Sequence, residues 1–174
     1  MFKKEHLKKA PKKVKFTIIT VSSSRYKRIS NHMMADDVTG NIAVKILEKY
    51  GLKFNSRYLV PDDKDAIVSI VLKSIHEDKS NLIILVGGTG VSNRDVTIEA
   101  ILPLFNKKLT SFETIFSLLS YMQIGADCIM SRATGGVINK SAVFLLPGSD
   151  KAVKLALDKI IGPEIRHLLH HLRE

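Results

Sequence analysis

Runs of apolar residues predict strands at several places along the chain. Val14–Val21 is a β-branched run too short for a typical helix, and Leu82–Val86 is a continuous apolar run typical of a strand covered on both faces. Phe54–Val60 and Ser141–Leu146 are also expected to be strands. Ile129–Ala133 is expected to be a further strand, followed by a turn at either Gly135-Gly136 or Asn139-Lys140.

Between these runs, apolar residues recur at the spacing of one helix face. Val38–Leu47 shows this pattern and ends at Gly51, while Ser22–Asp36 is polar and is expected to be a loop. The remaining expected helices are one that follows Pro61-Asp62-Asp63, Thr97–Phe105, Phe112–Met122, Asp150 to about Ile161, and, after a break at Gly162-Pro163, Glu164–Arg173.

The alternation of strands and helices predicts βαβ units and therefore a mostly parallel sheet. We expect an α/β fold of three layers, with helices on both faces of the central sheet. In such sheets ligands bind outside the carboxyl ends of the strands, where the strand order reverses. Polar or glycine-rich turns follow Val21, Val60, Val86 and Leu146, so the ligand site is expected at these turns.

The turn Gly87-Gly88-Thr89-Gly90 is the strongest local motif. Glycines tolerate positive φ and let the backbone approach a ligand closely, and successive N–H groups can surround an anion. The Thr89 hydroxyl adds a donor. The motif is neither a Walker loop nor a GxGxxG fingerprint, because no Lys-Ser/Thr follows and the spacing differs. A tight turn with no ligand is an equal alternative from these four residues alone.

Two aspartates at strand ends have both a functional and a structural interpretation. Asp95 precedes Thr97, which is expected to be a helix N-cap, so the Asp95 carboxylate is available to hold a magnesium ion or a substrate N–H, or to pair with Arg94 at the surface. Asp62 or Asp63 can cap the helix that follows them, and position alone favours capping for Asp62.

Serines and histidines supply weaker candidates. Ser149 in Pro147-Gly148-Ser149 is expected to cap a helix whose N-terminus would also attract phosphate. Ser22–Ser24 follow the first strand and can donate hydrogen bonds to an anion. His167 and His171 stand one helical turn apart, but no HExxH pattern accompanies them, so a solvated helix end is favoured over a metal site.

Composition narrows the class of protein. The 174 residues are 45% hydrophobic, which excludes a generally disordered chain, and no apolar run approaches the roughly 20 residues that span a bilayer. The single cysteine, Cys128, allows no internal disulfide, which favours a reducing, cytoplasmic location.

The net charge of +10 is uneven, because residues 1–15 carry seven lysines and one glutamate. We expect residues 1–13 to be a solvated basic tail on a domain formed by residues 14–174. Nucleic-acid binding by this tail is the less favoured alternative, because no aromatic residues are interleaved with the lysines.

Taken in order, the turns resemble the motifs of the MoaB/MogA family of molybdenum-cofactor biosynthesis proteins. Thr20–Arg25 resembles its Thr-Val-Ser-Asp-Ser-Arg block, and Asp37–Gly40 is similar to its Asp-x-Ser-Gly helix entry. Val60–Asp63 resembles its Ile/Val-Pro-Asp-Asp/Glu, and Gly87–Ala100 its Gly-Gly-Thr-Gly-…-Arg-Asp-Val-Thr-Pro-Glu-Ala. Later blocks match at Leu118–Gly125, Ser131–Ala133 and Leu146–Ser149, so the resemblance covers about residues 14–165.

The resemblance implies a molybdopterin adenylyltransferase, which transfers AMP from ATP to the terminal phosphate of molybdopterin with Mg²⁺ and releases pyrophosphate. It also implies homo-trimers or homo-hexamers. Asp62 and Asp95 match the family's functional aspartates and would act in catalysis and hold Mg²⁺. The residues expected to bind the substrates are Ser22, Ser23, Asp37, Gly40, Gly87, Gly88, Thr89, Gly90, Arg94, Pro147, Gly148 and Ser149.

The sequence also departs from the family pattern. Ser23 stands where relatives usually have Asp, Ile98 replaces a proline, and Ser117 replaces a frequent Arg. Ser111-Phe112-Glu113-Thr114 replaces Gly-Phe-Gly-Glu, so Thr114 occupies the usual position of the glutamate. Three interpretations follow: an active adenylyltransferase, a non-catalytic molybdopterin-binding protein, and an unrelated nucleotide- or nucleic-acid-binding module.

Overall fold

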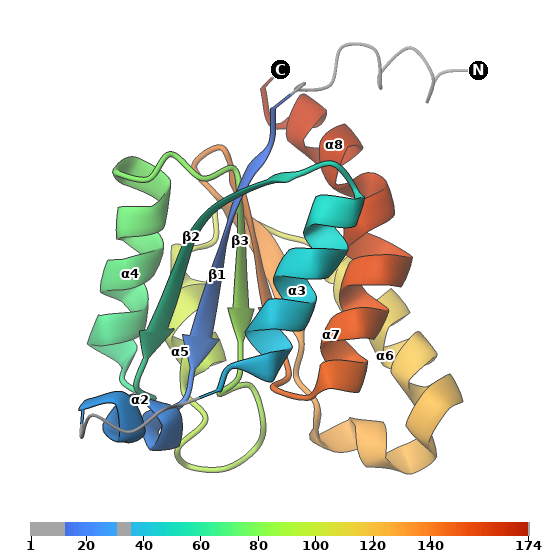
Figure 1. Ribbon diagram of the computed structural model, residues 1–174. Helices are drawn as coiled ribbons and strands as arrows, with labels where there is room; N and C mark the ends of the chain where they lie inside the picture. The colour runs from blue at the N-terminus through green and yellow to red at the C-terminus, as the bar shows by residue number, and fades with distance from the viewer. Residues whose placement is uncertain (1–12, 31–35, 174) are drawn as a thin grey trace.

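A computed structural model describes residues 13–30 and 36–173 of the chain (Figure 1). The predicted basic tail lies almost entirely outside the described residues, so the division into tail and domain stays a prediction. Within the described residues, no helix is long and apolar enough to cross a membrane.

Six strands form one mixed sheet in the order β2-β1-β3-β6-β5-β4. β2, β1, β3 and β6 are mutually parallel, while β5 and β4 are antiparallel additions at one edge. The strands are β1 (Lys15–Val21), β2 (Lys53–Val60), β3 (Leu82–Val86), β4 (Lys107–Lys108), β5 (Thr134–Ile138) and β6 (Ser141–Leu146). The expected mostly parallel sheet is confirmed.

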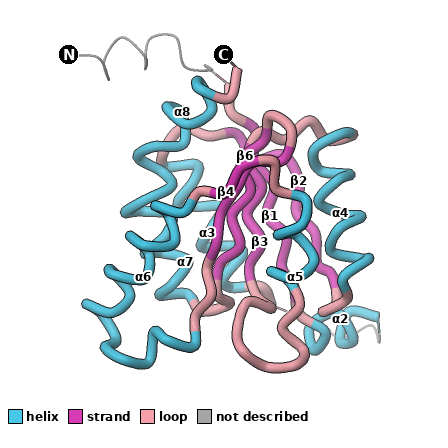
Figure 2. Tube along the Cα trace, turned by 180° about the vertical axis from the view of Figure 1, so that it is seen from behind, coloured by secondary structure: helices cyan, strands magenta, loops and turns pink. Residues whose placement is uncertain are grey.

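Helices cover both faces of this sheet, so the expected three layers are confirmed. Figure 2 shows α4 and α5 on one side and α3, α6, α7 and α8 on the other. The helices are α2 (Ser23–Ser30), α3 (Val38–Lys49), α4 (Lys64–His76), α5 (Thr97–Ile101), α6 (Thr110–Ile124), α7 (Asp150–Ala156) and α8 (Gly162–His171), with 3₁₀ turns η1 (Leu102–Leu104) and η2 (Gly125–Met130) and a π-helical turn η3 (Leu157–Ile161).

The central strands divide their side chains between two cores because successive residues of a strand face opposite sides. In β3, Leu82, Ile84 and Val86 pack with α3, α6, α7 and α8, whereas Ile83 and Leu85 pack with α4 and α5. All five side chains are buried. This two-sided burial explains why the strand reads as an uninterrupted apolar run.

The strand order brings the predicted turns to one edge. β1 lies between β2 and β3, so the chain passes from β1 to β2 on one side and then crosses to β3 on the other side. The carboxyl ends of the parallel strands point to the same edge (Figure 1). Backbone hydrogen bonds join these ends: Ser22 N–H donates to the Val60 carbonyl, and Gly87 N–H donates to the Leu146 carbonyl. This edge is the place where α/β sheets bind ligands.

One expectation about the fifth strand was wrong, and one of the two alternatives for the turn after it is confirmed. Ile129–Ala133 is not a strand: Ile129 and Met130 belong to η2 and are exposed, and β5 begins at Thr134. Gly135 and Gly136 lie within β5, where the rings of Phe144 and Phe105 pack against them and leave no room for a Cβ. The turn is at Asn139-Lys140, with Asn139 at φ 55°.

Two helix boundaries also differ from expectation. Ser23–Ser30 forms α2 rather than a loop, and it begins with the Tyr26 N–H donating to the Ser22 carbonyl. A polar helix on the surface gives no apolar periodicity to detect. Gly162-Pro163 does not break the C-terminal helix, because Pro163 stands at the first turn of α8 directly after η3, where its missing N–H is tolerated.

Candidate functional site

A cleft of about 440 Å³ opens at the carboxyl edge of β3 and β6. Three segments that are far apart in sequence form it: the glycine turn after β3, the turn after β6, and η2 with the residue after it. Its lining residues are Gly87, Gly88, Thr89, Gly90, Asp95, Asp127, Met130, Ser131, Pro147, Gly148 and Ser149. The structure therefore gathers most of the predicted substrate-binding residues around one cavity.

The first two glycines of the turn are required by their surroundings. Gly87 and Gly88 have φ values of 105° and 64°, a region that residues with a side chain rarely adopt. A Cβ at Gly87 would collide with the carbonyl oxygen of Val21, and one at Gly88 would collide with the Thr97 hydroxyl. The backbone after β3 thus lies directly against the end of β1.

The turn presents free backbone donors. Within the described part of the chain, the N–H groups of Gly88, Thr89, Gly90 and Val91 have no hydrogen-bond partner. Gly88, Thr89 and Gly90 are buried or half-buried, whereas Val91 is exposed. Buried N–H groups are nearly always paired in folded proteins, and consecutive unpaired ones can form an anion-binding concavity. The arrangement favours the anion-binding interpretation of Gly87–Gly90 over a turn without a ligand.

Asp95 lies on the wall of the cleft. Its Oδ2 accepts a hydrogen bond of 2.9 Å from Ser92 N–H and lies 2.9 Å from the place where a Cβ of Gly90 would stand. The alternative ion pair between Arg94 and Asp95 is not formed, and exposed Arg94 does not line the cleft. Thr97 is not the N-cap of α5; its hydroxyl donates to the Gly87 carbonyl instead.

Asp62 is not the cap of α4, because Asp63 accepts the capping bond from Ala66 N–H. Asp62 forms a reciprocal pair with Ser23: its Oδ2 accepts from Ser23 N–H at 2.8 Å, and its own N–H donates to Ser23 Oγ at 2.9 Å. Its Oδ1 lies 3.2 Å from the place of a Cβ on Gly88. Asp62 therefore stands beside the glycine turn, although it does not line the cleft itself.

Asp37 and Gly40 do not line the cleft and have structural contacts. Asp37 caps α3 by accepting from Gly40 N–H, and its Oδ2 accepts from the Thr20 hydroxyl at 2.6 Å. Arg57 Nε lies 3.4 Å from the same oxygen, which is an ion-pair contact rather than a hydrogen bond. The Arg57 guanidinium and the Asp37 carboxylate together leave no room for a side chain at Gly40.

The turn after β6 joins the cleft to α3. Ser149 caps α7, as expected, by accepting from Ala152 N–H. Thr39 donates to Asp150 Oδ1 at 2.5 Å and lies 3.4 Å from the Gly148 carbonyl, so it holds this turn against α3. Ser22 does not line the cleft and interacts with Arg25 N–H at the start of α2.

The region around β5 supplies site residues that the sequence reasoning missed. Arg132 Nε donates to the carbonyls of Gly90 (2.9 Å) and Thr89 (3.3 Å), and Arg132 Nη1 donates to Glu99 Oε1 at 2.6 Å. This hydrogen bond from Arg132 holds the pKa of the Glu99 carboxyl below its usual range. Ser131 lines the cleft, and its Oγ is buried with no partner among the described residues. The similarity of Ser131–Ala133 to the family's motifs was the available signal.

Comparisons with known proteins identify the family of the chain. The model of the probable molybdopterin binding domain matches residues 17–167. Molybdenum cofactor biosynthesis protein B of Bacillus subtilis is 43% identical over 171 residues, which cover 98% of this chain and 96% of that protein. The crystal structure of the tungsten cofactor synthesizing protein MoaB from Pyrococcus furiosus superposes with a TM-score of 0.84 at 37% identity, covering 95% of this chain and 100% of that one.

The chain belongs to the molybdopterin-binding domain family. This membership confirms the resemblance of its turns to the MoaB/MogA motifs and excludes an unrelated nucleotide-binding module. A counterpart named MogA superposes with a TM-score of 0.77 at 23% identity, which shows the shared fold.

Glu113, Thr114 and Ser117, which depart from the MoaB/MogA pattern, belong to α6. Glu113 accepts a hydrogen bond from the Thr134 hydroxyl, and its Oε1 lies 3.1 Å from Lys108 Nζ. Together with Ser117 it lines a neighbouring hollow of about 300 Å³, which shares Ser131 with the glycine cleft. The Thr114 hydroxyl donates to the Thr110 carbonyl of its own helix. Glu113 therefore lies beside the glycine cleft but does not line it.

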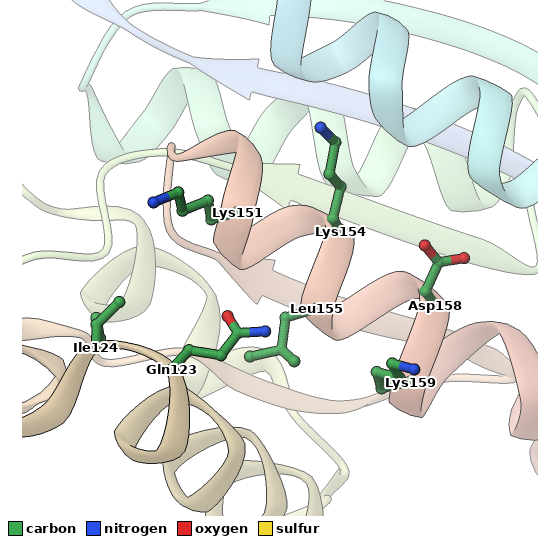
Figure 3. Close-up of a pocket in the computed structure, with 7 residues that line it drawn as sticks. All are labelled: Gln123, Ile124, Lys151, Lys154, Leu155, Asp158 and Lys159. Carbon is green, nitrogen blue, oxygen red and sulfur yellow. The ribbon is translucent and has the colours of Figure 1, made fainter.

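Two further features lie away from the glycine cleft. Figure 3 shows a groove between α6 and α7, of about 430 Å³, with lysines along α7 and Leu155 and Ile124 beside them; none of the predicted site residues lines it. His167 and His171 contact each other at 3.0 Å. Among the described residues, no group of three or more His, Cys, Asp or Glu is placed to hold a metal.

Proposed function

We propose that this protein acts in molybdenum cofactor biosynthesis as a molybdopterin adenylyltransferase, transferring AMP from ATP to the terminal phosphate of molybdopterin with release of pyrophosphate. The observation that carries the proposal is the run of unpaired N–H groups from Gly88 to Val91, of which Gly88, Thr89 and Gly90 line a cleft that also contains Asp95. Both substrates are phosphorylated, and such a run of donors suits phosphate oxygens. Membership of the molybdopterin-binding family supports molybdopterin as one of the two substrates.

The two aspartates suit a magnesium ion. Asp62 and Asp95 each use Oδ2 to accept one backbone N–H, and within the described residues Oδ1 of each has no hydrogen-bond partner. Mg²⁺ prefers one or two carboxylates completed by phosphate oxygens and water, so no third acidic residue is needed. Asp62 and Asp95 would hold the ion, which when bound neutralises phosphate charge.

The residues of the chain then have separate tasks. The N–H groups of residues 88–91 would hold phosphate oxygens and stabilise the negative charge that develops on them. Ser149 and Ser131, with its free hydroxyl, line the same cleft and can orient the second substrate. In the transfer, a terminal phosphate oxygen of the pterin bonds to the α-phosphorus of ATP while the bond to the pyrophosphate oxygen breaks. Positioning and charge neutralisation supply most of the catalysis in such transfers.

A direct assay tests the proposal. The purified protein is incubated with molybdopterin, ATP and Mg²⁺, and pyrophosphate and adenylylated pterin are measured. We expect equal amounts of both products, and no pyrophosphate when either the pterin or Mg²⁺ is omitted. Pterin binding without any pyrophosphate would contradict the catalytic proposal.

A non-catalytic molybdopterin-binding protein is the second candidate function. The observation that favours it is the position of Glu113, which is bonded to Thr134 and Lys108 outside the cleft, while Thr114 bonds within α6. The same assay separates the two functions, because a binding protein would retain the pterin and release no pyrophosphate.

We also propose that the protein works in the cytoplasm as a homo-oligomer. Large apolar side chains are exposed along residues 115–130, which we call the apolar α6 face: Ile115, Leu118, Tyr121, Met122, Ile124, Ile129 and Met130. Soluble monomers rarely expose large contiguous apolar patches, and such patches usually mark a protein contact. Trimers and hexamers, as the family resemblance implies, would both cover this face.

A further inference from the structure

Arg132 joins three segments that surround the glycine cleft. It follows η2, it contacts the glycine turn through Nε, and it contacts α5 through both Nη atoms, which donate to the two carboxylate oxygens of Glu99. Arg132 is separated by 33 to 43 positions of sequence from the residues that it contacts. Arg132 does not line the cleft itself but lines two neighbouring hollows, one of them together with Val91 and Asp95, so it contacts the turn from outside the cleft.

The contacts to the turn fix the direction of its donors. A peptide unit is planar and trans, so its carbonyl and the N–H of the next residue point in opposite directions. When Arg132 holds the carbonyls of Thr89 and Gly90, the N–H groups of Gly90 and Val91 must therefore point away from Arg132. These two groups belong to the run of donors that has no partner within the described residues.

Other contacts restrain the same loop but leave this part of it free. Thr97 ties its ends together, because its N–H donates to the Gly88 carbonyl and its hydroxyl donates to the Gly87 carbonyl. Asp95 accepts from Ser92 N–H farther along. In the middle of the loop, the Thr89 and Gly90 carbonyls are instead held by Arg132.

We propose that Arg132 is a positioning residue that orients the free N–H groups of the glycine turn for a phosphate-bearing ligand. Only the identity of the ligand rests on the proposed function. A guanidinium is suited to this task because Nε can face the turn while the Nη pair forms a fork with Glu99. A lysine keeps the charge but cannot make both contacts at once.

The test compares Arg132→Lys with Arg166→Lys in the ligand-free protein. Arg166 is a matched control, because it also donates to a backbone carbonyl, that of Gly51, at 2.7 Å and away from the cleft. Amide ¹⁵N order parameters of Gly90 and Val91 should fall from about 0.85 to below about 0.6 in Arg132→Lys and stay high in the control. Unchanged order parameters in Arg132→Lys would overturn the proposal.

Binding of inorganic pyrophosphate, measured by calorimetry, gives the second readout. We expect affinity to fall at least tenfold in Arg132→Lys and to stay unchanged in Arg166→Lys, with melting temperatures within about 4 °C of wild type, because exposed ion pairs add little stability. Full affinity in Arg132→Lys would show that Arg132 acts only as a charge and would overturn the proposal. If wild type binds pyrophosphate but does not adenylylate molybdopterin, the proposed function fails while the role of Arg132 stands.

Discussion

At the scale of single residues, neighbouring acids in this protein do different work. Asp62 and Asp63 are adjacent at the end of β2, yet Asp63 caps α4 and Asp62 is bonded to Ser23 beside the glycine turn. Asp63 therefore supplies the cap, which leaves the Asp62 carboxylate available for the proposed site chemistry. Mutation can separate the two roles.

We predict that Asp62→Asn and Asp95→Asn each lower the adenylylation rate by on the order of a hundredfold or more, because each removes a charge from the proposed magnesium site. Both variants should melt close to wild type, since the amide oxygen of Asn still accepts the N–H of Ser23 or Ser92. Initial rates of pyrophosphate release and thermal unfolding measure the two effects.

Asp63→Ala is the control for this pair. It removes the cap bond to Ala66 N–H and should cost about 1 kcal/mol of stability with little change in rate. If Asp62→Asn and Asp95→Asn also lost stability and kept full specific activity, the two aspartates would be structural.

We predict that Gly148→Ala weakens molybdopterin binding without unfolding the protein. A Cβ at Gly148 would meet only the Gly87 Cα, at 3.7 Å, and the residue lines the cleft. The added methyl group should reduce affinity by roughly tenfold by narrowing the space for the ligand, which corresponds to about 1.4 kcal/mol. Fluorescence titration with the pterin and a melting curve provide the measurement.

Gly88→Val is the contrasting variant. Its side chain would collide with the Thr97 hydroxyl at a positive φ, so this variant should be strongly destabilised. Unchanged pterin affinity in a folded Gly148→Ala protein would show that the ligand does not occupy this part of the cleft.

At the scale of elements, β2 and α4 are joined by a charged network whose residues do not line the glycine cleft. Tyr58 of β2 donates to Asp78 Oδ2 at 2.7 Å, and Lys73 of α4 lies 3.2 Å from Asp78 Oδ1. Partial burial raises the pKa of the Asp78 carboxyl, but the hydrogen bonds from Tyr58 and Lys73 outweigh it, so this pKa lies below its ordinary value. The hydrogen bond with Tyr58, followed by that with Asp78, raises the pKa of Lys73 to about 12.

We predict that Asp78 stabilises the fold at neutral pH and loses this effect in acid. Because its folded pKa is depressed, the stabilisation is complete above the ordinary aspartate pKa of about 4 and disappears as the pH falls through the lower, folded value. Asp78→Asn should therefore lower the free energy of unfolding at pH 7 by on the order of 1 kcal/mol, with the difference from wild type shrinking toward about pH 2. Urea unfolding across this range measures it.

Glu77→Gln is the matched control for Asp78. Glu77 lies 3.8 Å from the same Lys73 Nζ but its side chain is 70% exposed, so its removal should change stability very little. A difference between wild type and Asp78→Asn that stays constant with pH would contradict the linkage.

At the scale of the whole molecule, the apolar α6 face and the glycine cleft adjoin each other. Met130 is 55% exposed and belongs to the face, and it also lines the cleft. Packing of a second copy on this face would therefore cover one wall of the site. We therefore expect association of two copies of the chain to affect ligand binding in the cleft.

We predict that Leu118→Glu or Met122→Glu dissociates the oligomer, because burying a charge in an apolar contact is costly. Both side chains are more than half exposed in the single chain, so the fold itself should persist. Sedimentation velocity measures the mass, and circular dichroism checks the fold. Val38→Glu, at an exposed apolar position outside the face, should leave the oligomer intact. A monomeric wild type would contradict the proposal.

The sequence by itself determined the central architecture, because local patterns fix those elements. β1, β3 and β6 are apolar runs and α3 and α4 carry one apolar face, so the mostly parallel sheet with helices on both faces followed from them. Elements with no such pattern were not determined in this way: Ser23–Ser30 was expected to be a loop, and the turn after the fifth strand was left open between two positions. The polar helix α2 and the turn at Asn139-Lys140 depend on packing, namely on the bonds between Ser23 and Asp62 and on the rings over Gly135 and Gly136.

The site divides in the same way. The glycine turn and the two aspartates were visible as residue types at strand ends, where backbone donors and carboxylates suit phosphate chemistry. Only the tertiary structure decided which of them share the cleft. It placed Asp37 and Gly40 beside Arg57, away from the cleft, and it brought Arg132 to the turn across more than 40 positions of sequence. Contacts of that separation depend on the strand order, and no local pattern along the chain encodes them.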